Sequence, residues 1–460
     1  MQDKPAASVM DRYNDTPVWY EGENKINEAA FCEEFLLDHP MATENGIFFT
    51  EDGRIQDEKD VERMILLDLQ GVLKKNVARR VKDLLALLRL TAAKASVPIQ
   101  TDRIHVANGT FFLDGCFLPY KEDIVRNRLP VVYDPDAPKP ERWLRFLDQL
   151  LYPEDVPTLQ EFIGYCLIPT NKGQRMLILK GAGGEGKSQI GAVLSAMFGS
   201  SMKDGSIGKI SENRFARADL EHILLLVDDD MRMDALKQTN YVKSIVTAQG
   251  KMDLERKCQQ SYQGWMFARL MGFSNGDLQS LYDRSDGFYR RQLLIAIRPK
   301  PKDRVDDPGI ADKLKQELPG IFLWALEGLK RLIANDYHFT ESDRAKEYRE
   351  QMKRTQNNVL EFLDSEGYIR FRADCEVSSK QLYEVYRLWC EDNSLTPMKP
   401  RSFSDTMMEQ AQRLNLEYTN NITNPDGRRV RGFLGIQALA HPKTVMDFSN
   451  SLRTYVPDDD

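Results

Sequence analysis

Residues 181–188 read Gly-Ala-Gly-Gly-Glu-Gly-Lys-Ser, a spacing that suits a phosphate-binding loop. A short apolar run at 175–180 precedes it and a helical pattern at 189–199 follows, as the pattern Gly-x4-Gly-Lys-Ser requires. The glycines allow backbone N–H groups to turn inward around phosphate oxygens, and the helix start adds its positive dipole end. We therefore predict a nucleotide site formed by Gly181, Ala182, Gly183, Gly184, Glu185, Gly186, Lys187, Ser188 and Gln189.

The chemistry of such a loop assigns roles to its last residues. We expect Lys187 to reach the β- and γ-phosphates of ATP and Ser188 to ligate Mg²⁺. A second acid must hold the magnesium water shell and polarise the attacking water. The apolar run that ends in three aspartates at 222–230 supplies it, and we favour Asp228 for magnesium and Asp229 for water.

Two further elements follow along the chain. The apolar run 267–275 ends in Asn275, which we expect to touch the γ-phosphate or the water, although a lone Asn also caps loops. The segment 284–297 supplies Arg290 and Arg291, and an arginine that reaches a neighbour's γ-phosphate stabilises the charge of the transition state. Arg290 is favoured over Arg291, and a solvated or acid-paired arginine remains the alternative.

These motifs together resemble those of superfamily 3 helicases. The matching stretches are GAGGEGKS, LLLVDDD, FSN and DRSDGFYRR, within about residues 100–300. The resemblance is closest to the phage, plasmid and poxvirus-type primase-helicase ATPases of mobile elements. It implies an AAA+-like module that forms a homo-oligomeric ring, commonly a hexamer, with ATP sites between subunits. The family often has a glutamate in the acid cluster, whereas this chain has only aspartates.

The same resemblance implies a β-hairpin that projects into the ring channel and moves along single-stranded DNA. Residues 252–258 and 261–267 are its expected strands, with Arg256 and Lys257 near the tip and Lys251 behind them. Cations in such a place can grip phosphates. An ordinary surface hairpin with basic residues is the alternative.

The carboxy-terminal region resembles a winged helix. An amphipathic helix at 378–393 and a second helix at 399–414 precede two short strands around 424–427. Arg401 would lie near the start of the groove-entering helix, and Arg428 and Arg429 would line the wing. Winged helices also bind proteins, so a protein partner is the alternative.

The 460 residues predict an α/β protein of several domains. Apolar residues recur at helical spacing from Glu28 to about Leu90, and Asn-Gly and Asp-Gly pairs predict a hairpin at 104–119. The expected parts are a flexible tail at 1–25, a mainly helical domain with a small hairpin at 26–150, the ATPase at 151–304, a helical lid and linker at 305–355, a winged helix at 356–440 and a tail at 441–460.

Composition narrows the function further. The net charge of −7 predicts local rather than whole-molecule attraction to DNA, and the isolated histidines support neither a histidine-metal nickase nor a zinc hydrolase. The six scattered cysteines predict buried free thiols in a reducing cytosol. No apolar run reaches the ~18 residues of a membrane span. The first twenty residues lack a basic region followed by an apolar one, so we expect no secretory signal and a cytoplasmic location.

The sequence therefore predicts a Mg²⁺- and ATP-dependent DNA helicase that acts on single-stranded and forked DNA during replication of a mobile element. A separate primase or host replication proteins are its expected partners, because the amino-terminal region offers only Asp134 and Asp136, in a proline-rich linker, as primase-like carboxylates. Two alternatives stay open: a non-unwinding AAA+ initiator that binds origin DNA and recruits host proteins, and a P-loop kinase or GTPase.

Overall fold

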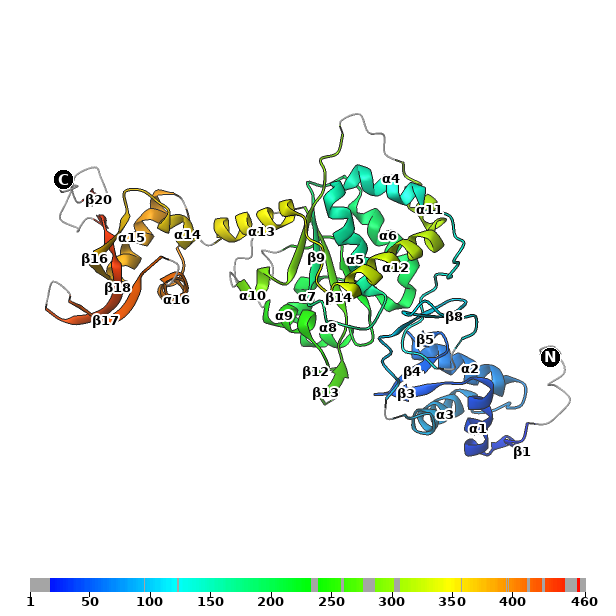
Figure 1. Ribbon diagram of the computed structural model, residues 1–460. Helices are drawn as coiled ribbons and strands as arrows, with labels where there is room; N and C mark the ends of the chain where they lie inside the picture. Colours follow the sequence, from blue (N-terminus) through cyan, green and yellow to red (C-terminus); the bar gives the residue numbers. More distant parts are fainter. Residues whose placement is uncertain are drawn as a thin grey trace. The chain divides into compact units, whose positions relative to one another are not determined.

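The computed structural model divides the chain into two compact units, residues 1–346 and 347–460, which are described separately (Figure 1). The residues it describes are 17–94, 96–121, 124–232, 239–257, 260–275, 286–301, 307–356, 358–393, 395, 397–411, 414–423, 427–442 and 453–455.

A five-stranded parallel sheet forms the centre of the first unit, with strand order β10-β11-β14-β9-β15. Its strands are β9 (Met176–Lys180), β10 (Met202–Asp204), β11 (Leu225–Asp228), β14 (Arg269–Ser274) and β15 (Gln292–Ala296). Strand β14 and the first four residues of β9 are buried throughout, which is why these segments read as apolar runs without alternation. The predicted α/β class is confirmed, and its central sheet is parallel.

Helices surround this sheet, and α5, α6 and α12 share its hydrophobic core (Figure 1). Helices α5 and α12 lie against each other, and Arg331 Nε of α12 donates to Glu161 Oε1 of α5 at 2.6 Å. The helices of this part are α4 (Glu141–Leu150), α5 (Val156–Cys166), α6 (Lys187–Phe198), α7 (Ile207–Glu212), α8 (Arg214–Ala218), α9 (Thr239–Thr247), α10 (Asp286–Tyr289), α11 (Ile310–Lys315) and α12 (Leu318–Ala334). Helix α13 (Asp343–Gln356) begins in the first unit and continues past its last residue into the second.

Short strands alternate with helices in the amino-terminal part of the first unit. Strands β3–β5 interrupt a stretch whose spacing predicts only helices, because Asn45 and Gly46, both at positive φ, form a tight two-residue turn. Strands β6–β8 form the predicted hairpin and meander. The elements are β1 (Tyr20–Gly22), β2 (Lys25–Ile26), α1 (Glu28–Asp38), β3 (Ala42–Glu44), β4 (Ile47–Thr50), β5 (Gly53–Arg54), α2 (Glu58–Gln70), α3 (Val77–Thr91), β6 (Arg103–Val106), β7 (Gly109–Phe112) and β8 (Phe117–Leu118).

The second unit packs three helices with an antiparallel sheet of order β16-β18-β17. Ser378 caps α15 by accepting a hydrogen bond from Gln381 N, as its place before an amphipathic pattern predicts. Phe362, Tyr386 and Phe403 lie in its aromatic core. The elements are α14 (Asn358–Leu363), β16 (Ile369–Ser378), α15 (Ser379–Asp392), α16 (Pro400–Ala411), β17 (Glu417–Thr423) and β18 (Arg429–Ala438), with a further pair β19 (Ala440–Pro442) and β20 (Arg453–Tyr455).

The structure bears on two expectations for the whole chain, the absence of a membrane span and the buried free thiols. Within the described residues, no helix has the length and apolar character needed to cross a bilayer. None of the five described cysteines forms a disulfide, and Cys32, Cys166 and Cys390 are buried as expected. Cys116 is exposed instead, because it follows the Asp114-Gly115 turn between β7 and β8 at the surface.

The α5–α12 contact tests the packing directly. A methyl group on Gly164 of α5 would lie 2.4 Å from the carbonyl oxygen of Ala325, so we expect Gly164→Ala to lower the free energy of unfolding by ~1–3 kcal/mol or more. Urea denaturation measures the change. Gly250→Ala is the matched control, because a Cβ there meets nothing within 4 Å. Equal stability of the two variants would contradict this packing.

Candidate functional site

The parallel register brings three polar segments to one edge of the sheet. The loop 181–186 follows β9, Asp228 ends β11, and Asn275 follows β14. Strands β9 and β14 pair with Lys180 level with Ser274, and Gly181 N donates to Ser274 O at 3.0 Å. Ligands of open α/β sheets bind at this carboxyl edge of the strands. The loop, Asp228 and Asn275 therefore lie at the carboxyl edge of the same sheet.

The glycine-rich loop folds back on itself before α6 begins. Gly183, Gly184 and Gly186 have φ values of 107°, 77° and 105°, a region that residues with side chains rarely adopt. The backbone amides of Ala182 and Gly183 turn inward as a result, and both donate to the carboxylate of Glu185. The Gly183 amide lies 3.0 Å from each Glu185 oxygen.

Lys187 points to the same carboxylate. Its Nζ lies 2.8 Å from Glu185 Oε2, and both side chains are buried, with exposed fractions of 6% and 3%. Burial raises the pKa of the Glu185 carboxyl. Lys187 and the loop amides lower that pKa by more than burial raises it, so the pKa of Glu185 lies below its ordinary value. A carboxylate of the chain thus occupies a ring of donors that suits an external anion. Ser188 is exposed and Gln189 half-buried at the start of α6.

The acid cluster has one buried and two exposed members. Asp228 Oδ2 accepts a hydrogen bond from Ile207 N at 2.7 Å, and Oδ1 accepts one from Asp230 N at 3.3 Å. Burial raises the pKa of Asp228, and these two bonds oppose the rise. Asp229 and Asp230 are exposed. Asp228 is thus fixed in the structure, whereas Asp229 faces solvent.

Asn275 stands beside the glycine-rich loop. A Cβ on Gly183 would lie 3.9 Å from Cγ and Oδ1 of Asn275, whose side chain is exposed. A polar amide therefore faces the loop from the neighbouring strand. Within the described residues, no three His, Cys, Asp or Glu side chains form a metal site by themselves.

The two candidate arginines differ in their surroundings. Arg291 is half-buried, and its Nη1 donates to Gly287 O. Arg290 is exposed next to it, at the end of α10. Arg290 is therefore the more accessible of the two for a neighbouring molecule. The additional arginine at position 284 lies outside the described residues.

The predicted hairpin is present as β12 (Lys251–Leu254) and β13 (Tyr262–Trp265), which pair antiparallel. Lys251 and Lys257 are exposed. Arg256 is half-buried instead, and its Nη2 lies 2.8 Å from Glu221 Oε2. The sequence did not point to Glu221, because its partners come from segments far away along the chain.

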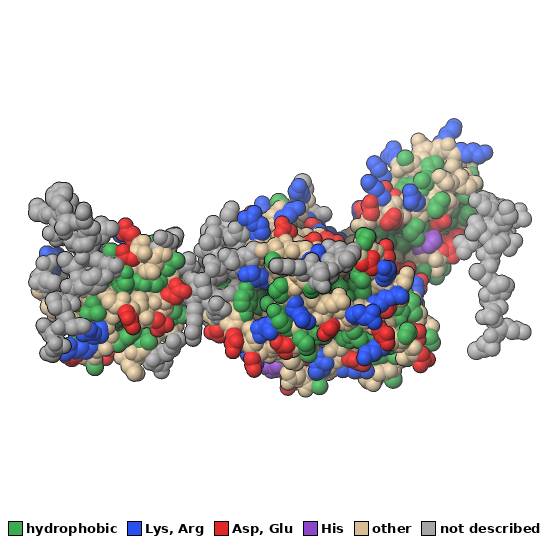
Figure 2. Space-filling model, turned by 90° about the horizontal axis from the view of Figure 1, so that it is seen from above, with side chains coloured by type: hydrophobic (Ala, Val, Ile, Leu, Met, Phe, Trp, Pro, Cys, Tyr) green, Lys and Arg blue, Asp and Glu red, His purple; other side chains and the backbone are tan. Residues whose placement is uncertain are grey.

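The basic residues of the second unit lie at its surface. Arg401 is exposed in the first turn of α16, and Arg428 and Arg429 are exposed where β18 begins. Arg429 is level with Thr423 in the β17–β18 pair. Figure 2 shows acidic and basic side chains mixed over the central part of the chain, in keeping with the net charge of −7.

Comparison with known proteins identifies structures with a similar fold but gives no function for this chain. A family of unknown function (DUF5906) matches residues 179–291, the stretch that carries the glycine-rich loop, the acid cluster and Asn275. No curated protein matches the sequence. An apo structure of the NrS-1 C-terminal region (305–718) is similar over 90% of this chain and 100% of that one, with 13% identity and a TM-score of 0.51.

A second structure of that region, the A form apo structure, covers 88% of this chain and 98% of its own at 12% identity and a TM-score of 0.48. At 13% identity, the likeness to the NrS-1 C-terminal region shows a shared fold alone. The assignment of chemistry to this site therefore depends on the geometry of the residues themselves.

The Glu185 contacts generate a test of the loop as an anion site. Glu185→Gln keeps the side-chain shape but removes the charge that competes for Lys187 and the loop amides. We expect inorganic triphosphate to bind at least ~10-fold more tightly, because charge-assisted hydrogen bonds contribute about 1.5–3 kcal/mol. Calorimetric titration measures the affinity. Glu327→Gln, an exposed position on α12, is the control, and equal affinities of wild type and Glu185→Gln would refute the competition.

Proposed function

We propose that this chain is a Mg²⁺-dependent ATPase that moves along single-stranded DNA, in the manner of the superfamily 3 helicases whose motifs it resembles. The observation that carries the proposal is the meeting of the glycine-rich loop, Asp228–Asp229 and Asn275 at one edge of a parallel sheet. Each of these supplies a group that phosphoryl transfer to water requires.

The loop and Lys187 would hold the phosphates of ATP, once Glu185 has left the position it occupies here. Ser188 and Asp228 would hold Mg²⁺, which usually binds one or two protein groups together with substrate phosphates and water. Asp229 would orient the attacking water, and Asn275 would contact that water or the γ-phosphate. Mg²⁺ would neutralise the charge that develops on the phosphate oxygens.

The remaining elements support a motor rather than a small-molecule kinase. The β12–β13 hairpin carries exposed cations, and the exposed Arg290 suits an ATP site shared between the subunits of a homo-oligomeric ring such as a hexamer. The helices and three-stranded sheet of the second unit support a winged helix, with Arg401, Arg428 and Arg429 on its surface. Replication of a mobile element, in the cytoplasm and with a separate primase or host proteins, is the setting that the motif resemblance favours.

ATP hydrolysis with and without single-stranded DNA tests the proposal. We expect DNA to stimulate hydrolysis, and Lys187→Ala to lower the rate by roughly 10²–10³-fold, as does the loss of one charge-stabilising donor. Lys82→Ala, at an exposed position of α3, is the control. Thermal unfolding must accompany the assay, because Lys187→Ala leaves the buried Glu185 without its cation. A rate of ATP hydrolysis that does not change with DNA would contradict the proposed motor. Tight binding of duplex DNA without unwinding would favour the non-unwinding initiator.

The acid cluster has its own test. We expect Asp229→Asn to lower kcat by about 10²–10⁴-fold with little change in KM, the range for loss of a general base. Asp228→Asn should instead raise the Mg²⁺ concentration needed for half-maximal rate. Steady-state kinetics across a Mg²⁺ titration separates the two effects. Asp230→Asn is the matched control, since Asp230 is exposed beside them. A kcat unchanged in Asp229→Asn would remove it from the reaction.

A further inference from the structure

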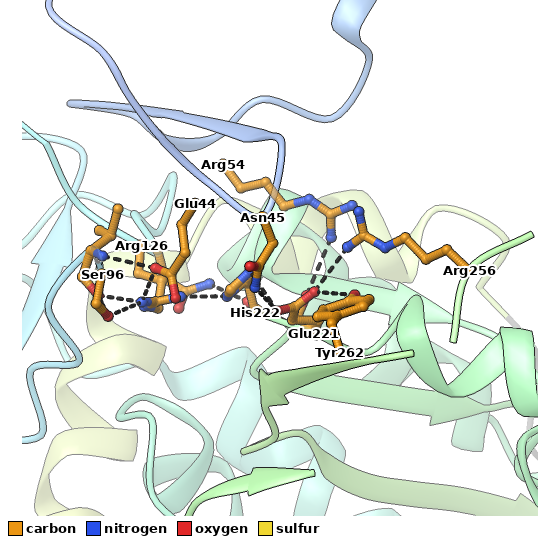
Figure 3. A network of polar contacts seen from close by, with 11 residues as sticks. Glu44, Asn45, Arg54, Ser96, Arg126, Glu221, His222, Arg256 and Tyr262 are labelled. Atoms are coloured by element: carbon orange, nitrogen blue, oxygen red, sulfur yellow. Dashed lines mark hydrogen bonds and ion pairs between the residues drawn. The ribbon is translucent and has the colours of Figure 1, made fainter. Parts of the chain in front are cut away.

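Glu221 is a fully buried carboxylate in the turn between α8 and β11. Two groups of the hairpin bind its Oε2: Arg256 Nη2 at 2.8 Å and Tyr262 Oη at 2.6 Å (Figure 3). Arg256 also lies over the Tyr262 ring, 5.3 Å from its centroid. Since Arg256 follows β12 and Tyr262 begins β13, Glu221 holds both sides of the hairpin near its tip.

The amino-terminal part of the chain reaches the same residue. Asn45 Nδ2 lies 3.5 Å from Glu221 Oε1, and Arg54 Nη1 donates to the Glu221 carbonyl at 3.3 Å. Asn45 lies in the β3–β4 turn and Arg54 ends β5. Glu221 thus joins the hairpin to the strands β3–β5, whose contacting residues lie 176 and 167 residues before Glu221 in the sequence (Figure 3).

His222 extends the network on its other side. Arg126 Nη1 lies 2.6 Å from His222 Nδ1, and Arg126 Nη2 pairs with Glu44 Oε2 at 2.6 Å. Burial and the nearby arginines lower the pKa of His222 well below its ordinary value, so the ring is neutral and Nδ1 accepts. Asn127 Nδ2 donates to the His222 carbonyl at 2.7 Å. The turn that precedes β11 is therefore fixed by its backbone and its side chains.

The hairpin is shaped to accept the Glu221 carboxylate. A Cβ on Gly264 of β13 would lie 2.5 Å from Leu254 Cδ1 and 2.7 Å from Glu221 Oε1, so the glycine leaves the space that these two side chains occupy. A buried carboxylate that loses its cation is strongly unfavourable, which resists any movement of Arg256 away from Glu221. Lys251 and Lys257 of the hairpin are exposed, and Lys251 Nζ lies 5.5 Å from the centroid of the Trp265 ring.

We propose that Glu221 is the positioning residue of the β12–β13 hairpin, that Arg256 serves this anchor, and that Lys251 and Lys257 make the hairpin's contacts with DNA phosphates. The DNA part of this proposal rests on the proposed function. It reassigns Arg256, which the sequence resemblance places among the residues that contact DNA.

Glu221→Gln distinguishes an anchor from a competitor. If Glu221 positions the hairpin, the variant needs several-fold more single-stranded DNA for half-maximal stimulation of ATP hydrolysis. If Glu221 merely competes with DNA for Arg256, the variant needs less DNA, and the proposal is overturned. Tyr262→Phe removes a single hydrogen bond to the same carboxylate and should act in the same direction with a smaller effect, should Glu221→Gln fold poorly.

The salt dependence of DNA binding separates the cations. Each phosphate contact to a single strand contributes about 0.7 to the slope of log K against log salt concentration. We expect Lys257→Ala to reduce the magnitude of this slope by about 0.7. We expect Arg256→Ala to weaken DNA binding and to leave the slope unchanged. If Arg256→Ala reduces the slope as much as Lys257→Ala does, Arg256 contacts DNA phosphates and its role in the anchor is overturned.

Limited trypsin digestion tests the anchor without DNA. Cleavage after Arg256 or Lys257 in the native chain should be several-fold faster in Glu221→Gln than in wild type, with Glu327→Gln as the control of equal charge. An unchanged cleavage rate overturns the anchor. A wild-type chain that binds no single-stranded DNA instead overturns the proposed function and the DNA part of this inference, and digestion then still decides whether Glu221 holds the hairpin.

Discussion

The hydrogen-bonded register of β11, β14 and β9 is the constraint on which the candidate site depends. Asp228 is level with Gly272, and Ser274 is level with Lys180, so three strands from separate stretches of sequence end at one edge. Bonds beyond the strands hold their exits in place: Gly181 N donates to Ser274 O, and Met231 N donates to Phe273 O. A slip of one residue would turn every side chain of a strand to the opposite face, so the burial of the sheet on both sides also fixes the site.

Two buried carboxylates illustrate how this chain places charge. Glu185 and Glu221 each have a cation and further donors within hydrogen-bonding distance, which compensates for the loss of water. They differ in what their partners do next. Under the proposed function, the donors around Glu185 are the ones that would bind phosphate, so the Glu185–Lys187 pair would have to open before ATP binds. The donors around Glu221 come from separate segments of the chain, so these contacts hold the hairpin and the amino-terminal strands together.

Strand β11 links these two places. The turn at Glu221 and His222 precedes the strand, and Asp228 ends it. A short, fully buried strand thus connects the hairpin anchor with the acid cluster, through backbone that neighbouring strands hold on both sides. The amino-terminal strands contribute to the same anchor through Asn45 and Arg54. The amino-terminal part is thereby bound to the residues that position the hairpin.

The family resemblance predicts the hairpin, with strands at 252–258 and 261–267, where the structure has β12 at Lys251–Leu254 and β13 at Tyr262–Trp265. The sequence by itself determined the local features: the glycine-rich loop between a strand and a helix, the apolar runs that end in Asp228 and Asn275, and the Ser378 cap. Each depends on residue types within a few positions, where turn chemistry and periodicity decide the conformation. The helical spacing did not predict strands β3–β5, because one Asn-Gly turn decides the conformation there against that spacing. Only the structure showed that Glu185 folds back onto the loop amides, because glycines leave the backbone a choice of conformations that residue types alone do not decide. Only the tertiary structure decided that Arg256 pairs with Glu221, because burial brings together groups whose separation along the chain carries no signal.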